Sequence, residues 1–188
     1  NDIFSYPTIA LLATQIQKRS TESVLPAIVR EVRPEKIPLS FSQERVWFID
    51  QLEGSVQYHI PFVLRLRGKL DIEALSNSLN EIVNRHEVLR TVIRSTGGLA
   101  YQYITKKDAW EINVVDDKAY KEDSKALEAY IQKLIKTPFD LENDFMFRAS
   151  IINQQKDEYL RVAKMKRIAA DAWSIGLKVK EEISVTKI

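Results

Sequence analysis

The side chains best suited to proton transfer in this sequence are its two histidines, His59 and His86. An imidazole titrates near neutral pH, so one ring nitrogen can accept a proton while the other is held by a neighbour. Neither histidine accompanies a serine or cysteine in the pattern of a catalytic triad. Because the chain has two histidines and no cysteine, we also expect no metal site. His86 is expected to be structural at a helix end, and His59 to lie in a turn before a strand.

A second group of polar side chains lies in residues 161–176, where Lys166 and Arg167 are followed by Asp171. A guanidinium has five hydrogen-bond donors, no acceptor and a pKa above about 12, so Arg167 cannot take up a proton. We expect the ammonium of Lys166 to be exposed and therefore protonated. Neither cation can then serve as a general base.

Residues 161–176 resemble the active-site motif of non-ribosomal peptide synthetase condensation domains, His-His-x-x-x-Asp-Gly, which Trp-Ser usually follows. Lys166 and Arg167 occupy the two histidine positions, Asp171 is retained, Ala172 replaces the glycine, and Trp-Ser comes next. Four further stretches resemble family segments in the same order. They are residues 37–47, residues 58–71, residues 85–91, and residues 138–141 with 147–149.

The resemblance implies amide formation between two carrier-bound thioesters, with the second motif histidine pointing into a tunnel. With Arg167 in that position, the chain is expected to keep the scaffold without the reactivity. Asp171 corresponds to a structural aspartate that pairs with an arginine, and Arg90 is the expected partner. The alternative is an aspartate at a helix start, favoured by the helix dipole and without a specific partner. Ala172 adds a methyl group at the position where the family's glycine lets the backbone approach closely or turn sharply. Structural roles are expected for Arg85, His86 and Arg90.

The elements that position these residues follow from apolar spacing. Ser40 with Gln43 predicts a capping box at the start of a helix, and residues 62–67 alternate as a half-buried strand does. An apolar stripe predicts a helix from residue 72 to 89. The remaining predictions are strands near 90–94, 101–104, 112–115, 145–153 and 158–168, a helix over 122–136, and a final helix from about Asp171. This mixture predicts an α+β fold, a mainly antiparallel sheet with helices packed on one side.

The resemblance refines this prediction to the amino-terminal lobe of a chloramphenicol-acetyltransferase-like fold, over residues 38–188. Residues 1–20 resemble the carboxy-terminal helix of a carrier domain, with Pro7 at its start. Residues 21–37 are polar, contain two prolines and are predicted to be a linker. No Gly-Gly-x-Ser site occurs in the carrier-like segment, so we expect no cofactor bound directly. Substrates would arrive on the phosphopantetheine arms of carrier domains.

Bulk properties narrow the function classes. The formal charge is +2, but residues 161–188 carry seven Lys and Arg against three Asp and Glu. No basic stripe interleaved with aromatic residues and no known binding motif accompanies these charges, so nucleic acid is a minor hypothesis. No run of 18 apolar residues or charged leader is found, so we expect a cytoplasmic protein without a membrane span.

The strand before the motif carries Arg161, Lys164, Lys166 and Arg167, cations on both of its faces. A buried strand should not carry them, so we expect these side chains to meet water. The expected partners are carrier domains and a carboxy-terminal lobe missing from this chain, and self-association is left open. Two alternatives to an inactive lobe remain. One is a non-catalytic carrier-docking module, and the other is an acyltransferase completed by dimerisation or a partner lobe.

Overall fold

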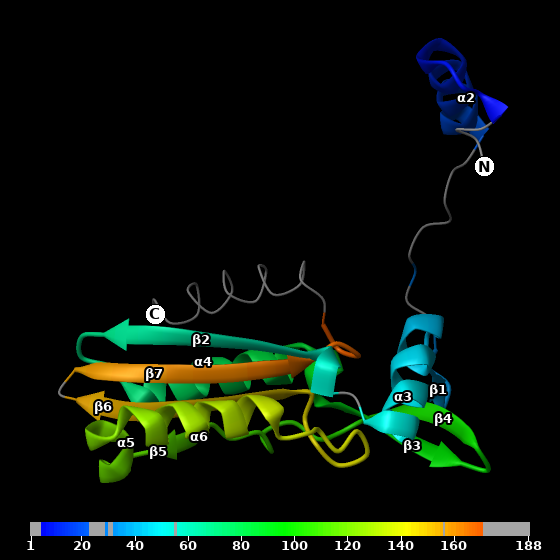
Figure 1. The fold of residues 1–188 in the computed structure, drawn as a ribbon. Coiled ribbons are helices and arrows are strands. Elements are labelled where there is room, and N and C mark those ends of the chain that lie inside the picture. Colours follow the sequence, from blue (N-terminus) through cyan, green and yellow to red (C-terminus); the bar gives the residue numbers. More distant parts are fainter. Residues whose placement is uncertain (1–4, 23–28, 30–31, 55, 156, 171–188) are drawn as a thin grey trace. The chain divides into compact units, whose positions relative to one another are not determined.

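A computed structural model describes residues 5–22, 29, 32–54, 56–155 and 157–170 (Figure 1). The chain divides into two compact units, Asn1–Pro34 and Glu35–Ile188. In the first unit, helix α2 spans Ile9–Glu22 and begins two residues after Pro7. The helix predicted for this segment is therefore present, while its assignment to a carrier domain stays a prediction.

Four strands form the main sheet of the second unit in the order β2-β7-β6-β5 (Figure 1). The long strands are β2 (His59–Arg67), β6 (Phe147–Gln155) and β7 (Glu158–Lys166), and the short one is β5 (Asn113–Val115). β7 pairs antiparallel with both β2 and β6, whereas β5 runs parallel to β6. Because β7 is central, both of its edges are hydrogen-bonded.

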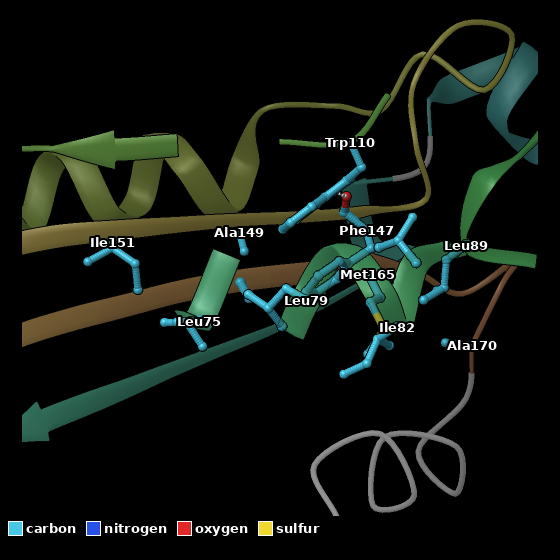
Figure 2. Close-up of a cluster of buried hydrophobic side chains, with 12 residues drawn as sticks. Leu75, Leu79, Ile82, Leu89, Trp110, Phe147, Ala149, Ile151, Met165 and Ala170 are labelled. Atoms are coloured by element: carbon cyan, nitrogen blue, oxygen red, sulfur yellow. Dashed lines mark hydrogen bonds between the residues drawn. The ribbon is translucent and has the colours of Figure 1, made fainter. Parts of the chain in front are cut away.

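Helices pack on both faces of this sheet. α4 (Ile72–Arg85) covers the face that carries Ala163 and Met165, and α6 (Ser124–Lys136) covers the face that carries Leu160 and Val162. Figure 2 shows the α4 side, where Leu75, Leu79 and Ile82 meet Phe147, Ala149, Ile151 and Met165. The α+β class is confirmed, but the helices are not confined to one side. β7 is buried at both alternating sets of positions from Leu160 to Lys166, as a strand covered on both faces is.

A smaller sheet has the order β1-β4-β3, with β1 (Ile37–Pro38), β3 (Thr91–Thr96) and β4 (Leu99–Ile104). Its β3-β4 hairpin turns at Gly97 and Gly98, both with positive φ, which a two-residue turn of this kind requires. α3 (Phe41–Glu53) begins with the predicted capping box: the Ser40 amide donates to Gln43, and the Gln43 amide donates to the Ser40 hydroxyl.

A second core joins the two sheets near the end of β7. The amide of Ile93 donates to Leu141, and the amide of Met146 donates to Leu89, at 2.7 and 3.0 Å. These bonds fix the segment before β6 against β3. The buried members of this core are Leu39, Val46, Ile93, Phe139, Leu141, Met146 and Ile168.

One predicted helix ends earlier than expected, and another begins two residues later than expected. The helix expected to reach residue 89 ends at Arg85, because His86 adopts φ −98° and ψ 92°, and the 3-10 helix η2 (Glu87–Arg90) follows. The helix expected over 122–136 is α6, separated from α5 (Lys118–Glu122) by Asp123, whose carboxylate caps α6. A further 3-10 helix, η1, spans Val56–Tyr58. The helix predicted from Asp171 lies outside the described residues. Within the described part of the chain, no helix is long and apolar enough to cross a membrane.

Replacing Leu79 with alanine tests the packing of α4 on the sheet. The side chain is 2% exposed, so Leu79→Ala is expected to lower the free energy of unfolding by about 2–5 kcal/mol. Leu99→Ala is the matched control, because Leu99 is 78% exposed, and its effect should stay within about 0.5 kcal/mol. Urea denaturation followed by circular dichroism measures both, and equal losses would contradict this packing.

Candidate functional site

The end of β7 is where the predicted motif begins. The amide of Lys166 donates to Met146, and the amide of Arg167 donates to Tyr58, at 3.0 and 2.9 Å. The side-chain amide of Gln43 reaches the carbonyl of Ile168 at 3.5 Å, so the start of α3 contacts the segment that follows Arg167. Asp171 and Ala172 lie outside the described residues, and the expected pairing of Asp171 with Arg90 stays a prediction.

Lys166 is buried, contrary to the prediction that its ammonium is exposed. Its side chain has no exposed area, and its Nζ lies 3.0 Å from Oδ1 of Asp50 in α3. Burial lowers the pKa of Lys166, while the hydrogen bond and the charge of Asp50 oppose that shift. Lys166 therefore connects the end of β7 to α3 through a buried ion pair, and Arg167 beside it is exposed.

The expected exposure of the strand cations is wrong for Arg161 and Lys164 as well. Both are 4% exposed. The guanidinium of Arg161 lies 5.5 Å from the centre of the Phe62 ring, and burial lowers its pKa. The Nζ of Lys164 donates a hydrogen bond to the carbonyl of Thr137, at the end of α6. Each cation of β7 is buried because a ring, a carbonyl or a carboxylate replaces part of its hydration.

Four nitrogen-bearing side chains surround the ring of Phe139, and we call them the Phe139 cluster: His59, Arg148, Lys164 and Lys166. The charged groups of Arg148, Lys164 and Lys166 lie 4.7, 4.9 and 6.0 Å from the ring centre, respectively. His59 meets the ring edge-on at 5.1 Å. The ion pairs that involve the cluster are Arg148 with Asp144 and Lys166 with Asp50.

The surroundings of His59 favour its neutral form. It is the first residue of β2 rather than part of a preceding turn, and its Nδ1 lies 2.9 Å from the carbonyl of Ile135. Since a carbonyl can only accept, Nδ1 donates the hydrogen in this bond. Burial lowers the pKa of His59, and the charges of Lys164, Lys166 and Arg148 lower it further.

The residues around His86 make contacts within the fold. Arg85 pairs with Glu81 at 3.5 Å, and the amide of His86 closes α4 on Ile82. Arg90 is buried, and its Nη1 donates to the carbonyl of Thr105 at 2.5 Å. The loop after β4 is thereby tied to η2. An open pocket of about 510 Å³ is lined here by Arg85, His86, Arg90 and Lys107 with Glu81 and Glu87.

Sequence reasoning missed Asp50, Phe139 and Thr137, the groups that receive the buried cations. Asp50 stands within the apolar run of α3, which could have indicated a buried partner of opposite charge. Phe139 and the carbonyl of Thr137 carry no comparable signal. Among the described residues, no group of three or more histidine, aspartate or glutamate side chains is arranged to hold a metal ion.

Removing one partner of the Lys166–Asp50 pair tests its role. Lys166→Met leaves the partly buried Asp50, 15% exposed, without its ammonium, and a loss of up to about 3 kcal/mol in the free energy of unfolding is expected. The double variant Lys166→Met/Asp50→Leu should be more stable than the single one, because neither charge remains. Lys106→Met, at an exposed position, is the control. A double variant less stable than Lys166→Met in urea denaturation would contradict the pair.

The titration of Lys164 gives a pH dependence with a definite sign. Burial, with the charges of Arg148 and Lys166 against that of Asp144, lowers the pKa of Lys164 from 10.5 to about 8. Between these values the unfolded chain binds more protons than the folded one, so folding stability rises with pH. This contribution is complete above pH 10.5 and lost by pH 8.

The parent protein should therefore gain stability relative to Lys164→Met as the pH rises from 8 to 10.5. Urea midpoints of the two proteins at both ends of this range measure the difference. Parallel changes in the two proteins would show that Lys164 titrates as in the unfolded chain.

Comparisons with known proteins show the family to which this chain belongs. The family model described as Condensation domain matches residues 34–185. The chain is 38% identical over 176 residues to the dimodular nonribosomal peptide synthase of Bacillus subtilis (strain 168), covering 92% of this chain and 7% of that protein. It is 36% identical over 182 residues to malpinin synthetase of Mortierella alpina, covering 95% of this chain and 2% of that protein.

Solved structures agree on the fold. The X-domain from teicoplanin biosynthesis has a TM-score of 0.76 and 28% identity, and the match covers 86% of this chain and 34% of that one. The starter condensation domain of the rhizomide synthetase RzmA has a TM-score of 0.72 at 19% identity, covering 81% and 38%, a likeness of fold alone. The chain thus spans a small part of the synthetases and about a third of these structures. It belongs to the condensation-domain family of non-ribosomal peptide synthetases.

Proposed function

We propose that this chain is the amino-terminal lobe of a condensation domain and that it retains the family scaffold without the amide-forming chemistry. The proposal rests on the side chains found at the two positions that correspond to the motif histidines. Lys166 is buried and ion-paired with Asp50, and its exposed neighbour is Arg167.

Amide formation from two thioesters requires an amine held in line with a carbonyl, a group that receives or steers the amine proton, and exclusion of water. Arg167 can only donate hydrogen bonds, so it cannot receive that proton. Lys166 is committed to Asp50 and has no exposed area from which to meet a substrate. His59 of β2 pairs with Lys166 of β7 across the sheet. Its imidazole ring, however, packs edge-on against Phe139.

The proportion of the fold present supports a single lobe. The chain covers 34% of the teicoplanin X-domain chain and 38% of the RzmA starter domain chain. In the family that the sequence resembles, two lobes form the tunnel between them. The proposed partners are accordingly a carboxy-terminal lobe and the carrier domains that deliver the thioesters.

The purified chain, mixed with two carrier domains loaded with aminoacyl thioesters, is expected to form no dipeptidyl thioester above the background of carriers alone. Mass spectrometry of the carriers measures the product. A complete two-lobe condensation domain with the same carriers is the positive control. Product formed by this chain and abolished by Asp171→Ala would contradict the proposal and favour an acyltransferase completed by dimerisation.

A docking role without catalysis is the second candidate, because the teicoplanin X-domain, 26% identical over 87% of this chain, has been solved in a complex with OxyB. In this chain α3 exposes Phe41, Phe48 and Leu52, which recur along one side of the helix. We propose this side of α3 as a contact surface for a carrier domain.

Phe41→Ser/Phe48→Ser is expected to weaken carrier binding at least tenfold, because apolar area is lost at the contact. Isothermal titration calorimetry with a carrier domain measures the affinity. Leu99→Ser is the matched control, an exposed apolar residue of β4 outside α3. Equal affinities of the parent and the double variant would exclude this surface.

A further inference from the structure

A pocket of about 320 Å³ lies beside the first residues of β6, and neither Lys166 nor Arg167 lines it. Its volume is at the lower end of the range for small-molecule sites. Its walls combine apolar side chains with two cations and their counter-charge. They include Trp110, Leu134, Phe147, Asp144, Arg148 and Lys164.

Lys164 is a buried residue of the pocket lining. Glu111 and Asn113, which also line it, are exposed, whereas Lys164 is 4% exposed. The Nζ of Lys164 donates one hydrogen to the carbonyl of Thr137, another residue of the pocket lining. Lys164 is thus a buried residue of the lining whose amine is oriented by its hydrogen bond to Thr137.

The charges around this amine favour its neutral form. Arg148 of β6 and Lys166 of β7 repel the ammonium, and Asp144 attracts it. Burial adds to the repulsion, so the pKa of Lys164 falls to about 8. About a tenth of the side chains are then free amine at pH 7, roughly 200 times the fraction for an ordinary lysine. His59 and Asp50 are the other titratable groups at the Phe139 ring and its cations.

We propose that Lys164 is a nucleophilic lysine that accepts an acyl group from small thioesters admitted to this pocket. The lone pair of the neutral amine attacks the thioester carbonyl carbon. A C–N bond forms and the C–S bond breaks. The sulfur leaves as a thiolate and takes up the proton that the nitrogen releases, so the products are an amide on Lys164 and a free thiol. A lysine shielded from water beside other cations is a recognised form of activated nucleophile.

This inference goes beyond the proposed function and does not depend on it. The step requires neither a carrier domain nor a second lobe, and its acceptor is a protein side chain rather than a second substrate. Labelling of Lys164 without dipeptide formation would leave the proposed function intact. Failure of labelling would equally leave it intact.

S-acetyl-N-acetylcysteamine is a suitable probe, incubated with the full chain at pH 7.5 and followed by peptide mass spectrometry. A less basic amine is also a weaker nucleophile, so the expected advantage of Lys164 over exposed lysines is about tenfold in rate. Lys106 and Lys107, both exposed, are the internal references. Lys166 is the buried reference outside the pocket and should remain unlabelled.

Two comparisons distinguish reactivity that depends on the folded pocket from the ordinary reactivity of a lysine. In urea the preference for Lys164 should disappear, because unfolding removes both the burial and the neighbouring cations. Arg148→Met removes one of those cations and frees Asp144 from its partner, so the rate at Lys164 should fall several-fold at pH 7.5. Labelling of Lys164 no faster than Lys106 in the folded parent protein, or only in urea, would overturn the proposal.

Discussion

The burial of three cations on the central strand is the constraint on which the rest of this lobe depends. β7 is covered by α4 on one face and by α6 on the other, yet it carries Arg161, Lys164 and Lys166. Each cation has lost hydration that the protein must replace. The replacements come from separate elements: the Phe62 ring of β2, the Thr137 carbonyl after α6, and the Asp50 carboxylate of α3.

These contacts also fix the end of β7, where the predicted motif begins. Because Lys166 is anchored to Asp50 and to the Met146 carbonyl, the chain leaves β7 at a defined point. Gln43 extends the same contact to Ile168 while its own side chain completes the cap of α3. The end of β7 is thus held in place by polar contacts with α3 and with the residue before β6.

Much of the fold could be predicted from local patterns. The Ser40–Gln43 cap, the strand over residues 62–67 and the stripe of α4 are determined by neighbouring residues, and all three are present, although Leu64 is exposed. The break at His86 was missed because apolar residues continue beyond it to Leu89, and the short helix α5 before Asp123 was not predicted. The burial of the β7 cations could not be read from spacing, since it depends on groups distant in the sequence. Asp50 lies 116 residues from Lys166.

The parallel pairing of β5 with β6 has a consequence for the whole lobe. Two neighbouring strands that run in the same direction cannot be joined by a tight hairpin, so the intervening chain must cross over the sheet. Here that crossover consists of α5 and α6, and it closes the face that α4 leaves open. The pairing of the three-residue strand β5 thereby requires a crossover that excludes water from the second face of the sheet. A lysine on that face must then find its hydrogen-bond partners within the protein.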